Sequence, residues 1–455
     1  MQERTHDILE KAAVSVQEIR SHLDRDEIPE ALEALSALRE ADQAEALSQM
    51  EVSQRRLLFS HLTHEAAGKI LNHMDIDEAV DLVVDIDPIT VALWLDGSNT
   101  TVAAHILRQL PPPRAKVVLE VMSDPEAVVP LLGHPEETAG GIMTPEFVAF
   151  RESVAAAEAL SWLRKSRPEP RVMSYLFVVD IWNRLTGVVA LSDLVLSEPD
   201  APLNELMDPD VIYVAAGTDQ EKCAQIMRRY DISTLPVVDE HSRLLGAILL
   251  EQVMEVVEEE ATEDMYYMAG LREPERVAAP LSASVRNRLP WLMLNLATIG
   301  LGVGVISLFE STIAKVVAAA AFLPIVASQG GVGGTQTLTL MVRGLALGEI
   351  DFGSIKKAVA KELALGLING TILGLVVGLV ALAWKGSIVL GLALGLAMIG
   401  NMIVAGVSGA VVPLGLKLLR IDPALASVVF VTTVTDVFGF LCFLGLVALL
   451  LPVLS

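Results

Sequence analysis

Residues 431–440 read VTTVTDVFGF and lie inside a stretch from Pro423 to Ser455 whose only charged residue is Asp436. A helix needs roughly 20 apolar residues to cross about 30 Å of hydrocarbon, so this stretch is long enough to span a membrane. Asp436 follows Pro423 by thirteen residues, which at about 1.5 Å per residue places it near the middle of the span. Inserting a carboxylate there costs roughly 2.5–3.5 kcal/mol of free energy even on the more lenient insertion scales. Such a residue therefore indicates a functional role.

The neighbours of Asp436 favour a role in cation passage. Thr432 and Thr433 precede it by four and three residues, and Gly439 follows it by three, so a helix brings all four residues to one face. Hydroxyl groups and a small residue beside one anion suit a passing cation. The alternatives are a protonated, hydrogen-bonded Asp436 or a device for helix packing, and we favour cation conduction.

Four other apolar runs follow residue 288, so the sequence predicts five membrane-spanning helices. These runs are Leu289–Phe309, Val316–Val342, Leu363–Trp384 and Gly386–Leu416. With the N-terminal half inside, eight Lys and Arg flank the cytoplasmic ends of the spans and only Lys315 and Lys385 lie outside. This asymmetry predicts a multi-pass protein of the inner (plasma) membrane with a cytoplasmic N-terminus and cytoplasmic soluble domains.

The second run contains Pro324 followed by SQGGVGGTQTLT at residues 328–339. Four glycines within five residues predict a broken helix, which survives in lipid only where protein or water satisfies the freed carbonyls. We expect a backbone-lined part of a pore, with a kink and close packing as the alternative. Asn295, Asn369 and Asn401 are interpreted as interhelical hydrogen-bonding residues.

Charge and composition narrow the class of ligand. The chain carries a net charge of −24, but residues from 281 onward hold ten basic and six acidic residues, a net of +4, against 23 and 51, a net of −28, before them. Such acidity argues against nucleic-acid binding and favours cations. With all eight histidines before residue 281, the membrane half offers mainly oxygen ligands, which suit Mg²⁺ or Ca²⁺. A symmetric homodimer would bring two copies of Asp436 to one path.

Residues 175–194 recur at 234–253 with an offset of 59, pairing Asp180 with Asp239 and Gly187 with Gly246. Each copy predicts a strand, a turn, a second strand after the glycine and then a helix. This duplication resembles a tandem CBS-domain pair, a regulatory module that often binds adenine nucleotides. Ser192 and Asp193 stand where such domains contact a ribose, whereas the second copy has Glu251 and Gln252 there. The resemblance makes ATP a candidate regulatory ligand, and a helix N-cap is the alternative role for Asp193.

Two other segments of the soluble half have clear patterns. Residues 30–130 predict short helices that stack into a coil, because MDIDEAVDLVV and IDPITVALWL recur about 12 residues apart. Residues 251–270 predict a helix, and six acidic residues fall within its residues 255–264, which is under three turns. Like charges at this spacing repel one another, so bound divalent cations would help this helix to dock and close a gate. A solvated acidic face is the alternative.

Taken together, the chain resembles the MgtE family of bacterial Mg²⁺ channels over nearly its whole length. The resemblance rests on HPEETAGGIMTPEFVAF (134–150), EATEDMYYMAG (260–270), RNRLPWLMLNL (286–296), VRGLALGE (342–349) and DPALASVVFVTTVTD (422–436). It implies a homodimer of three kinds of domain. These are an all-α superhelical domain at 1–133, an α/β tandem CBS pair at 134–250 (about 141–200 and 205–250), and a membrane domain of five helices at 281–455 that follows an acidic plug helix at 251–280.

The resemblance also implies site residues and their roles. Asp436 would be the pore residue for Mg²⁺, with Thr432 one turn away and Asp422 at the cytoplasmic mouth. Cytoplasmic Mg²⁺ would inhibit the channel by binding sensor carboxylates, namely Asp219, Glu221, Asp231, Glu255, Glu260, Glu263 and Asp264. One departure is Val332, which replaces an Asn of the family's second-helix signature and weakens the prediction of Mg²⁺ selectivity.

The leading hypothesis is therefore a Mg²⁺-selective channel for influx that closes when cytoplasmic Mg²⁺ is plentiful. A less selective channel or carrier for Mg²⁺, Co²⁺ and Ca²⁺ is the alternative within transport. A membrane-anchored nucleotide sensor is the alternative outside it. An enzyme is not expected, because no nucleophile–base set and no metal-ligand motif stands out in the soluble half.

Overall fold

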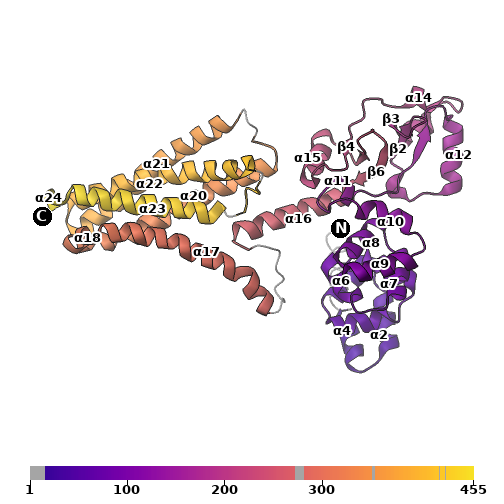
Figure 1. The fold of residues 1–455 in the computed structure, drawn as a ribbon, viewed down its shortest axis with the longest axis horizontal. Helices are drawn as coiled ribbons and strands as arrows, with labels where there is room; N and C mark the ends of the chain where they lie inside the picture. Colours follow the sequence, from indigo (N-terminus) through magenta and orange to yellow (C-terminus); the bar gives the residue numbers. More distant parts are fainter. Residues whose placement is uncertain (1–15, 272–280, 351–353, 420, 426, 455) are drawn as a thin grey trace, which may run out of the picture. The chain divides into compact units, whose positions relative to one another are not determined.

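The computed structural model describes residues 16–271, 281–350, 354–419, 421–425 and 427–454. It divides into two compact units, Met1–Val256 and Val257–Ser455 (Figure 1). The first unit contains helices and two small sheets, and the second is helical. The predicted fold class, an all-α part, an α/β pair and a helical membrane part, is confirmed.

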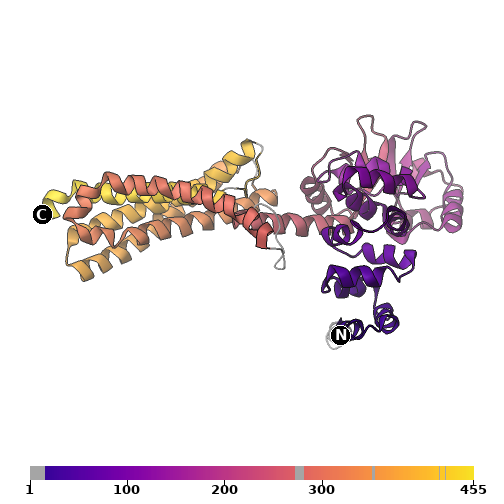
Figure 2. The same ribbon diagram turned by 60° about the horizontal axis from the view of Figure 1, so that its bottom comes forward.

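The first unit begins with short helices that stack on one another, as Figure 2 shows. They are α2 (Ile28–Ser36), α3 (Glu40–Ser48), α4 (Val52–Phe59), α5 (His64–Leu71), α6 (Ile76–Val83), α7 (Pro88–Asp96), α8 (Thr100–Gln109), α9 (Pro112–Val121) and α10 (Pro125–Leu132). The side chains of Asp75 and Asp87 cap α6 and α7 by accepting backbone N–H bonds at 3.0–3.3 Å. Because helices this short cannot bury an apolar face alone, they share one core that includes Phe59, Leu71 and Trp94.

The two sequence repeats form two sheets of the same design. The order in each sheet follows the chain, β1-β2-β3 and β4-β5-β6, with one parallel and one antiparallel pair. Their strands are β1 (Ala149–Arg151), β2 (Tyr175–Val179), β3 (Leu185–Ala190), β4 (Val214–Ala215), β5 (Thr234–Val238) and β6 (Leu244–Leu249). The helices among them are α11 (Ala139–Ile142), α12 (Ala156–Ser166), α13 (Leu191–Leu196), α14 (Leu203–Leu206) and α15 (Gln220–Tyr230), with a 3-10 turn at Pro170–Val172.

The turns between the paired strands keep the offset of 59 residues. Asn183 and Ser242 both have positive φ, 63° and 61°. Asp180 Oδ1 accepts the backbone N–H of Arg184 at 2.9 Å, and Asp239 Oδ1 accepts that of Arg243 at 2.8 Å. The aspartates therefore fix the turns, which explains their recurrence. The sequence predicted that the second strand of each copy begins after the glycine. In the structure β3 and β6 begin two residues before Gly187 and Gly246, so this detail of the prediction is wrong.

A 19-residue helix, α16 (Leu250–Met268), follows β6 and occupies the first part of the predicted plug segment 251–280. The chain turns at Gly270, which has a φ of 78°. Residues 272–280 of that segment lie outside the described residues. Tyr267 and Met268 at the end of α16 belong to the second unit and pack there against Leu338, Val342 and Ala424.

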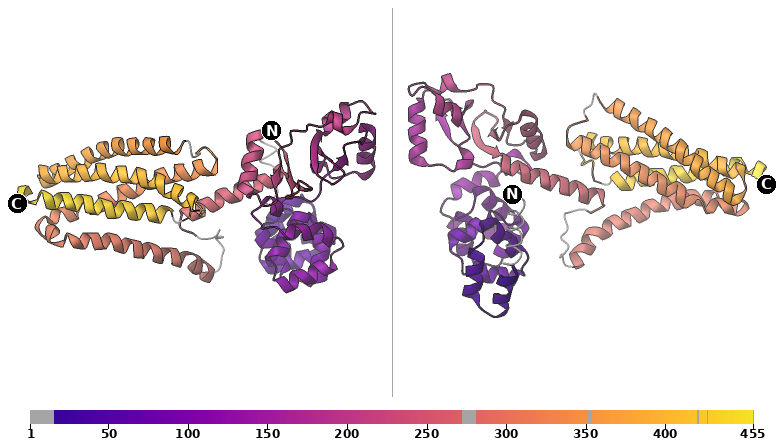
Figure 3. Two further views of the ribbon diagram at one scale, coloured as in Figure 1. Left: turned by 45° about the horizontal axis from the view of Figure 1, so that its top comes forward. Right: turned by 180° about the vertical axis from the view of Figure 1, so that it is seen from behind.

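The second unit contains five helices long and apolar enough to cross a membrane within the described residues. Its helices are α17 (Leu281–Leu308), α18 (Glu310–Lys315), α19 (Val317–Ala320), α20 (Leu323–Ala346), α21 (Ile355–Lys385), α22 (Ile388–Leu418), α23 (Ser427–Leu449) and α24 (Leu451–Leu454). Figure 3 shows α20 to α23 running beside one another. The prediction of five spans is confirmed.

Glycines bring α21 and α22 close together. A Cβ added at Gly374 would lie 2.5 Å from the carbonyl oxygen of Gly395, and one added at Gly378 would lie 2.8 Å from that of Gly391. Such small-residue contacts let backbones approach where lipid removes the hydrophobic drive for association.

The prediction of a broken second span is wrong. Residues 328–339 lie within the single helix α20, so their carbonyls are not freed to line a pore. The glycines instead allow close packing. A Cβ at Gly330 would clash with Asn401, and one at Gly334 would clash with Val431. The alternative of close packing is the one that the structure bears out, because an intact helix satisfies its backbone groups within lipid.

Candidate functional site

One face of α20 is polar and open. A cavity of about 460 Å³ is lined by residues of this helix alone, namely Ser328, Gly331, Val332, Thr335, Gln336 and Thr339. These positions recur every three to four residues, so they form one face of the helix. Ser328, Gln336 and Thr339 are exposed within a segment long enough to cross a membrane. Such a face is unsuited to contact with lipid tails.

A second cavity, of about 250 Å³, lies between α20, α21 and α22. Its lining includes Gln329, Val332, Gln336, Asn369 and Met402. Val332 and Gln336 therefore border both cavities, and Val332 is 52% exposed. Asn369 lies at a cavity wall, where the sequence predicted an interhelical hydrogen bond.

Asp436 lies in α23, with a partly buried side chain. Within the described part of the chain, its carboxylate forms no ion pair or side-chain hydrogen bond. Thr432, one turn earlier, donates its hydroxyl to the carbonyl of Val428 at 2.9 Å, which leaves the oxygen's lone pairs available. A Cβ at Gly331 would lie 3.6 Å from Thr432 Cγ2, so Thr432 borders the polar face of α20.

Gly439 does not leave room for a cation beside Asp436, as its small size suggested in the sequence. It is buried, and an added Cβ would meet Asn401 at 2.8 Å and Val326 at 2.9 Å. The hydroxyl of Thr433 donates to the carbonyl of Val429 at 2.6 Å. Gly439 is therefore a packing residue, needed because the buried Asn401 comes close to α23.

Predicted sensor carboxylates of the second unit gather around the end of α16. Burial, followed by the negative charges of Asp422, Glu260 and Glu263, raises the pKa of Asp264 to about 6. Burial and Glu263 also raise the pKa of Asp422, although its carboxylate accepts the backbone N–H of Ala424 at 2.7 Å. These four carboxylates repel one another, and a cation would relieve that repulsion.

The predicted sensor residues of the first unit have mainly local contacts. Asp219 caps α15 by accepting the backbone N–H of Glu221 at 3.0 Å, and Asp231 ends that helix with a φ of 53°. Glu255 is exposed on α16. Among the residues that the structure describes, no three His, Cys, Asp or Glu side chains are close enough to hold a metal ion.

The candidate ribose contacts lie at the start of α13. Both Ser192 and Asp193 are exposed, and Ser192 donates to Asp193 at 3.4 Å. In the second repeat, Gln252 accepts the backbone N–H of Leu249 at 2.8 Å and donates to Thr101 of α8 at 3.4 Å. The second copy of the position thus serves a structural contact.

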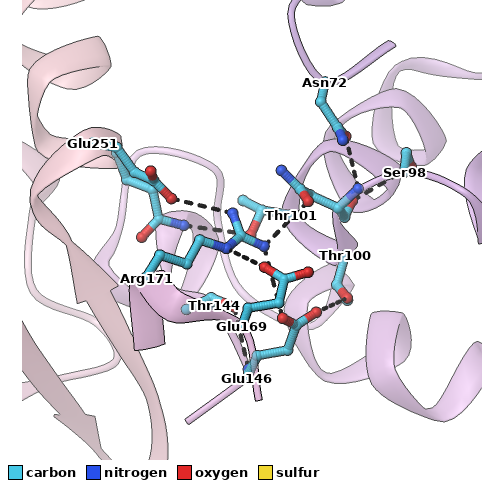
Figure 4. Close-up of polar contacts among 11 residues, drawn as sticks. Asn72, Ser98, Thr100, Thr101, Thr144, Glu146, Glu169, Arg171 and Glu251 are labelled. Atoms are coloured by element: carbon cyan, nitrogen blue, oxygen red, sulfur yellow. Dashed lines mark hydrogen bonds and ion pairs between the residues drawn. The ribbon is translucent and has the colours of Figure 1, made fainter. Parts of the chain in front are cut away.

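Sequence reasoning missed an ionic cluster centred on Arg171 (Figure 4). Its guanidinium bonds Glu169 at 2.6 Å and Glu251 at 3.1 Å, and lies 3.7 Å from Glu146. It also donates to Asn99, which precedes α8, at 3.1 Å. The partners lie up to 80 residues away, so no local pattern signals the cluster.

Sequence reasoning also missed a second carboxylate within the described membrane-spanning helices. Glu362 is only 7% exposed in α21 and accepts a hydrogen bond from Thr337 of α20 at 2.8 Å. The apolar run predicted from sequence begins at Leu363, whereas α21 begins at Ile355 and therefore includes Glu362.

Comparison with known proteins decides the family. A magnesium transporter MgtE of Thermus thermophilus is 34% identical over 97% of this chain and 99% of its own length. The chain belongs to the MgtE family. The MgtE family model, described as a divalent cation transporter, matches residues 323–446, the MgtE intracellular N domain model matches 14–95 and 38–137, and the CBS model matches 203–259.

One further relative and one solved structure are also similar to this chain. A magnesium transporter MgtE of Bacillus subtilis is 27% identical over 88% of this chain and 92% of its own length. The cytosolic domain of the Mg²⁺ channel MgtE, solved in complex with ATP, shares 31% identity, covering 54% of this chain and 99% of that domain with a TM-score of 0.49. The relative from Thermus thermophilus confirms the resemblance inferred from the motifs, and the family is one of transporters rather than enzymes.

Proposed function

We propose that this chain mediates Mg²⁺ influx as a channel, along a path lined by Asp436, Thr432 and the polar face of α20. The observation that carries the proposal is Asp436, a carboxylate within a membrane span that has no ion-pair partner among the described residues. Mg²⁺ releases its water reluctantly, and hydroxyl and amide groups such as those of Thr335 and Gln336 suit a hydrated ion.

A homodimer would complete the wall of this path. Ser328, Gln336 and Thr339 are exposed on one face of α20, and lipid would leave their polar groups unsatisfied. A second copy related by a two-fold axis would cover the face and supply a second Asp436. Mg²⁺ needs no ATP-driven pump to enter, because a divalent cation gains roughly 4.6 kcal/mol on moving inward at about −100 mV.

The cytoplasmic side is proposed to hold the sensor. Hydrated Mg²⁺ near Glu260, Glu263, Asp264 and Asp422, held mainly through its own water ligands, would relieve their repulsion and hold the end of α16 in place. Asp219, Glu221, Asp231 and Glu255 are proposed as further Mg²⁺ ligands of the soluble domains. ATP is proposed to bind the first CBS repeat at Ser192 and Asp193 as a regulatory ligand.

Val332 gives specific support to a second candidate, a less selective channel for Mg²⁺, Co²⁺ and Ca²⁺. Its apolar side chain borders both cavities beside Gln336. An apolar group offers no hydrogen bond to a hydrated ion, so the path has one fewer group with which to tell hydrated cations apart.

The test is cation uptake into proteoliposomes containing the full-length protein or Asp436→Asn. We expect the substitution to lower Mg²⁺ uptake by at least about tenfold, the equivalent of about 1.4 kcal/mol, while the protein stays folded and dimeric. Glu310→Gln is the matched control, because Glu310 is exposed in α18. Unchanged Mg²⁺ uptake by Asp436→Asn would show that the ion path does not depend on Asp436, whereas absence of uptake by both proteins would support a membrane-anchored sensor. Parallel uptake of Ca²⁺ and Co²⁺ separates the two transport candidates.

A further inference from the structure

The buried face of α20 carries two polar contacts to neighbouring helices. Near its start, Asn401 of α22 donates a hydrogen bond to the carbonyl of Val326 at 2.8 Å. Eleven residues later, Thr337 donates its hydroxyl to Glu362 of α21 at 2.8 Å. Eleven residues are about three turns of a helix, so both contacts lie on the same face. The rest of that face is apolar or small and includes Leu338, which is fully buried.

Glu362 is enclosed by three helices. Its side chain is 7% exposed and bonds Thr337 on α20. On the α22 side, a Cβ added at Gly406 would lie 2.7 Å from the carbonyl oxygen of Glu362, so the backbones are nearly in contact. Within the described residues, Glu362 forms no ion pair. Burying a carboxyl group at this position costs desolvation free energy, which an apolar side chain at the same position would not.

The hydrogen bond between Thr337 and Glu362 affects the orientation of the polar face of α20. Gln336 and Thr337 are neighbours in the helix, so their side chains point about 100° apart. Gln336 is exposed at both cavities, whereas Thr337 is buried. A hydrogen bond that holds Thr337 therefore also fixes the direction in which Gln336 points. Loss of the bond would let α20 turn about its axis and carry Val332, Thr335 and Gln336 away from the path.

We propose that Glu362 is a positioning residue for ion passage, which sets the rotation of α20 through its hydrogen bond with Thr337. This inference rests on the pore proposed above. The role requires an acceptor oxygen at residue 362 and does not require a charge. Glu362 thereby acts on the ion path from the opposite side of α20 without touching the ion.

The test combines flux with the accessibility of α20 in full-length protein. In a Cys442→Ser background, Gln336→Cys and Leu338→Cys are each labelled with a membrane-impermeant thiol reagent in proteoliposomes. The remaining Cys223 is buried. Each reporter is then combined with Thr337→Val, Glu362→Leu or Glu362→Gln. Thr371→Val is the matched control, because Thr371 is exposed on α21 and bonds its own helix at the carbonyl of Leu367.

We expect Thr337→Val and Glu362→Leu each to lower Mg²⁺ flux by about tenfold, the scale of one lost buried hydrogen bond. The double variant should lose no more than either single variant, because both remove the same contact. Labelling at residue 336 should fall and labelling at residue 338 should rise. Glu362→Gln, which keeps an acceptor oxygen, should retain flux and the original labelling.

The outcomes separate this inference from the proposed function. If Gln336→Cys resists labelling and Asp436→Asn transports normally, the pore itself is misplaced. The positioning role is wrong under a different set of results. In these, Gln336→Cys is labelled and Asp436→Asn loses transport, but Thr337→Val and Glu362→Leu leave flux and labelling unchanged. Loss of flux in Glu362→Gln with unchanged labelling would also overturn it, because the charge would then matter. Should Glu362→Leu fail to fold, Thr337→Val and Glu362→Gln still decide the question.

Discussion

Asp264→Asn is the substitution whose effect follows most directly from the electrostatics of the structure. Burial and the neighbouring carboxylates raise the pKa of Asp264 from 3.8 to about 6. A shift of about 2 pH units, at 1.36 kcal/mol each, corresponds to about 3 kcal/mol of penalty on the ionised group. Because the side chain is partly exposed, solvent screening lowers this penalty to about 1–2 kcal/mol. The neutral amide should remove that penalty and hold the end of α16 more firmly.

The pH dependence has a definite sign. The pKa of Asp264 is raised in the folded state, so the folded state binds the proton more tightly than the unfolded state does. Its contribution to stability is fully present below about pH 4 and is lost as the pH rises through about 6. The end of α16 should therefore be held more tightly at pH 5 than at pH 7. Mg²⁺ at pH 7 should have the same effect as the proton, since it neutralises the same group.

Amide hydrogen exchange over residues 257–268 measures the opening free energy of this segment. In the wild type, protection should increase from pH 7 to pH 5 and on addition of Mg²⁺ at pH 7. In Asp264→Asn, protection at pH 7 without Mg²⁺ should already be higher, and both responses should shrink. Glu258→Gln, also on α16 and exposed, is the control and should keep the wild-type responses. The reasoning is refuted if Asp264→Asn is no better protected at pH 7 and keeps the full response to pH.

Three further outcomes are expected. Asp87→Ala should lower the free energy of unfolding of the N-terminal helices by about 1 kcal/mol in thermal melts, because α7 loses its N-cap. Arg171→Met should destabilise the first unit by about 1–2 kcal/mol and speed proteolysis near Asn99, because three carboxylates lose their shared guanidinium; unchanged cleavage would contradict this. Val332→Asn should raise the ratio of Mg²⁺ to Ca²⁺ uptake without lowering stability, since the side chain is exposed at both cavities.

The sequence predicted those features whose cause is local or periodic. Apolar runs of sufficient length predicted five spans, and the structure contains five. The offset of 59 residues predicted two copies of one sheet, because the turn aspartates Asp180 and Asp239 recur with it. Asp436 was found because one charge within an uncharged span is visible without any knowledge of contacts.

Features that depend on distant partners were missed or misjudged. Glycines at 330–334 suggested a break in the second span, but Asn401 and Val431 fill the space that a side chain would take, and α20 stays intact. Arg171 carried no local signal in the sequence, since Asn99 and Glu251 are remote from it along the chain. Glu362 stood just outside an apolar run and gave no sign of burial. Each of these depends on packing between helices or domains, which periodicity does not report.

The two carboxylates within the described membrane-spanning helices have contrasting environments, and the contrast bears on their roles. Glu362 is enclosed by α20 and α22 and has a hydroxyl donor in Thr337. Asp436 is only partly buried and has no ion-pair partner within the described residues. A carboxylate that is buried and hydrogen-bonded by protein is poorly placed to bind a mobile cation, whereas a carboxylate without an ion-pair partner attracts one. The ion path is therefore assigned to the side of Asp436, and Glu362 to the packing that keeps α20 turned toward it.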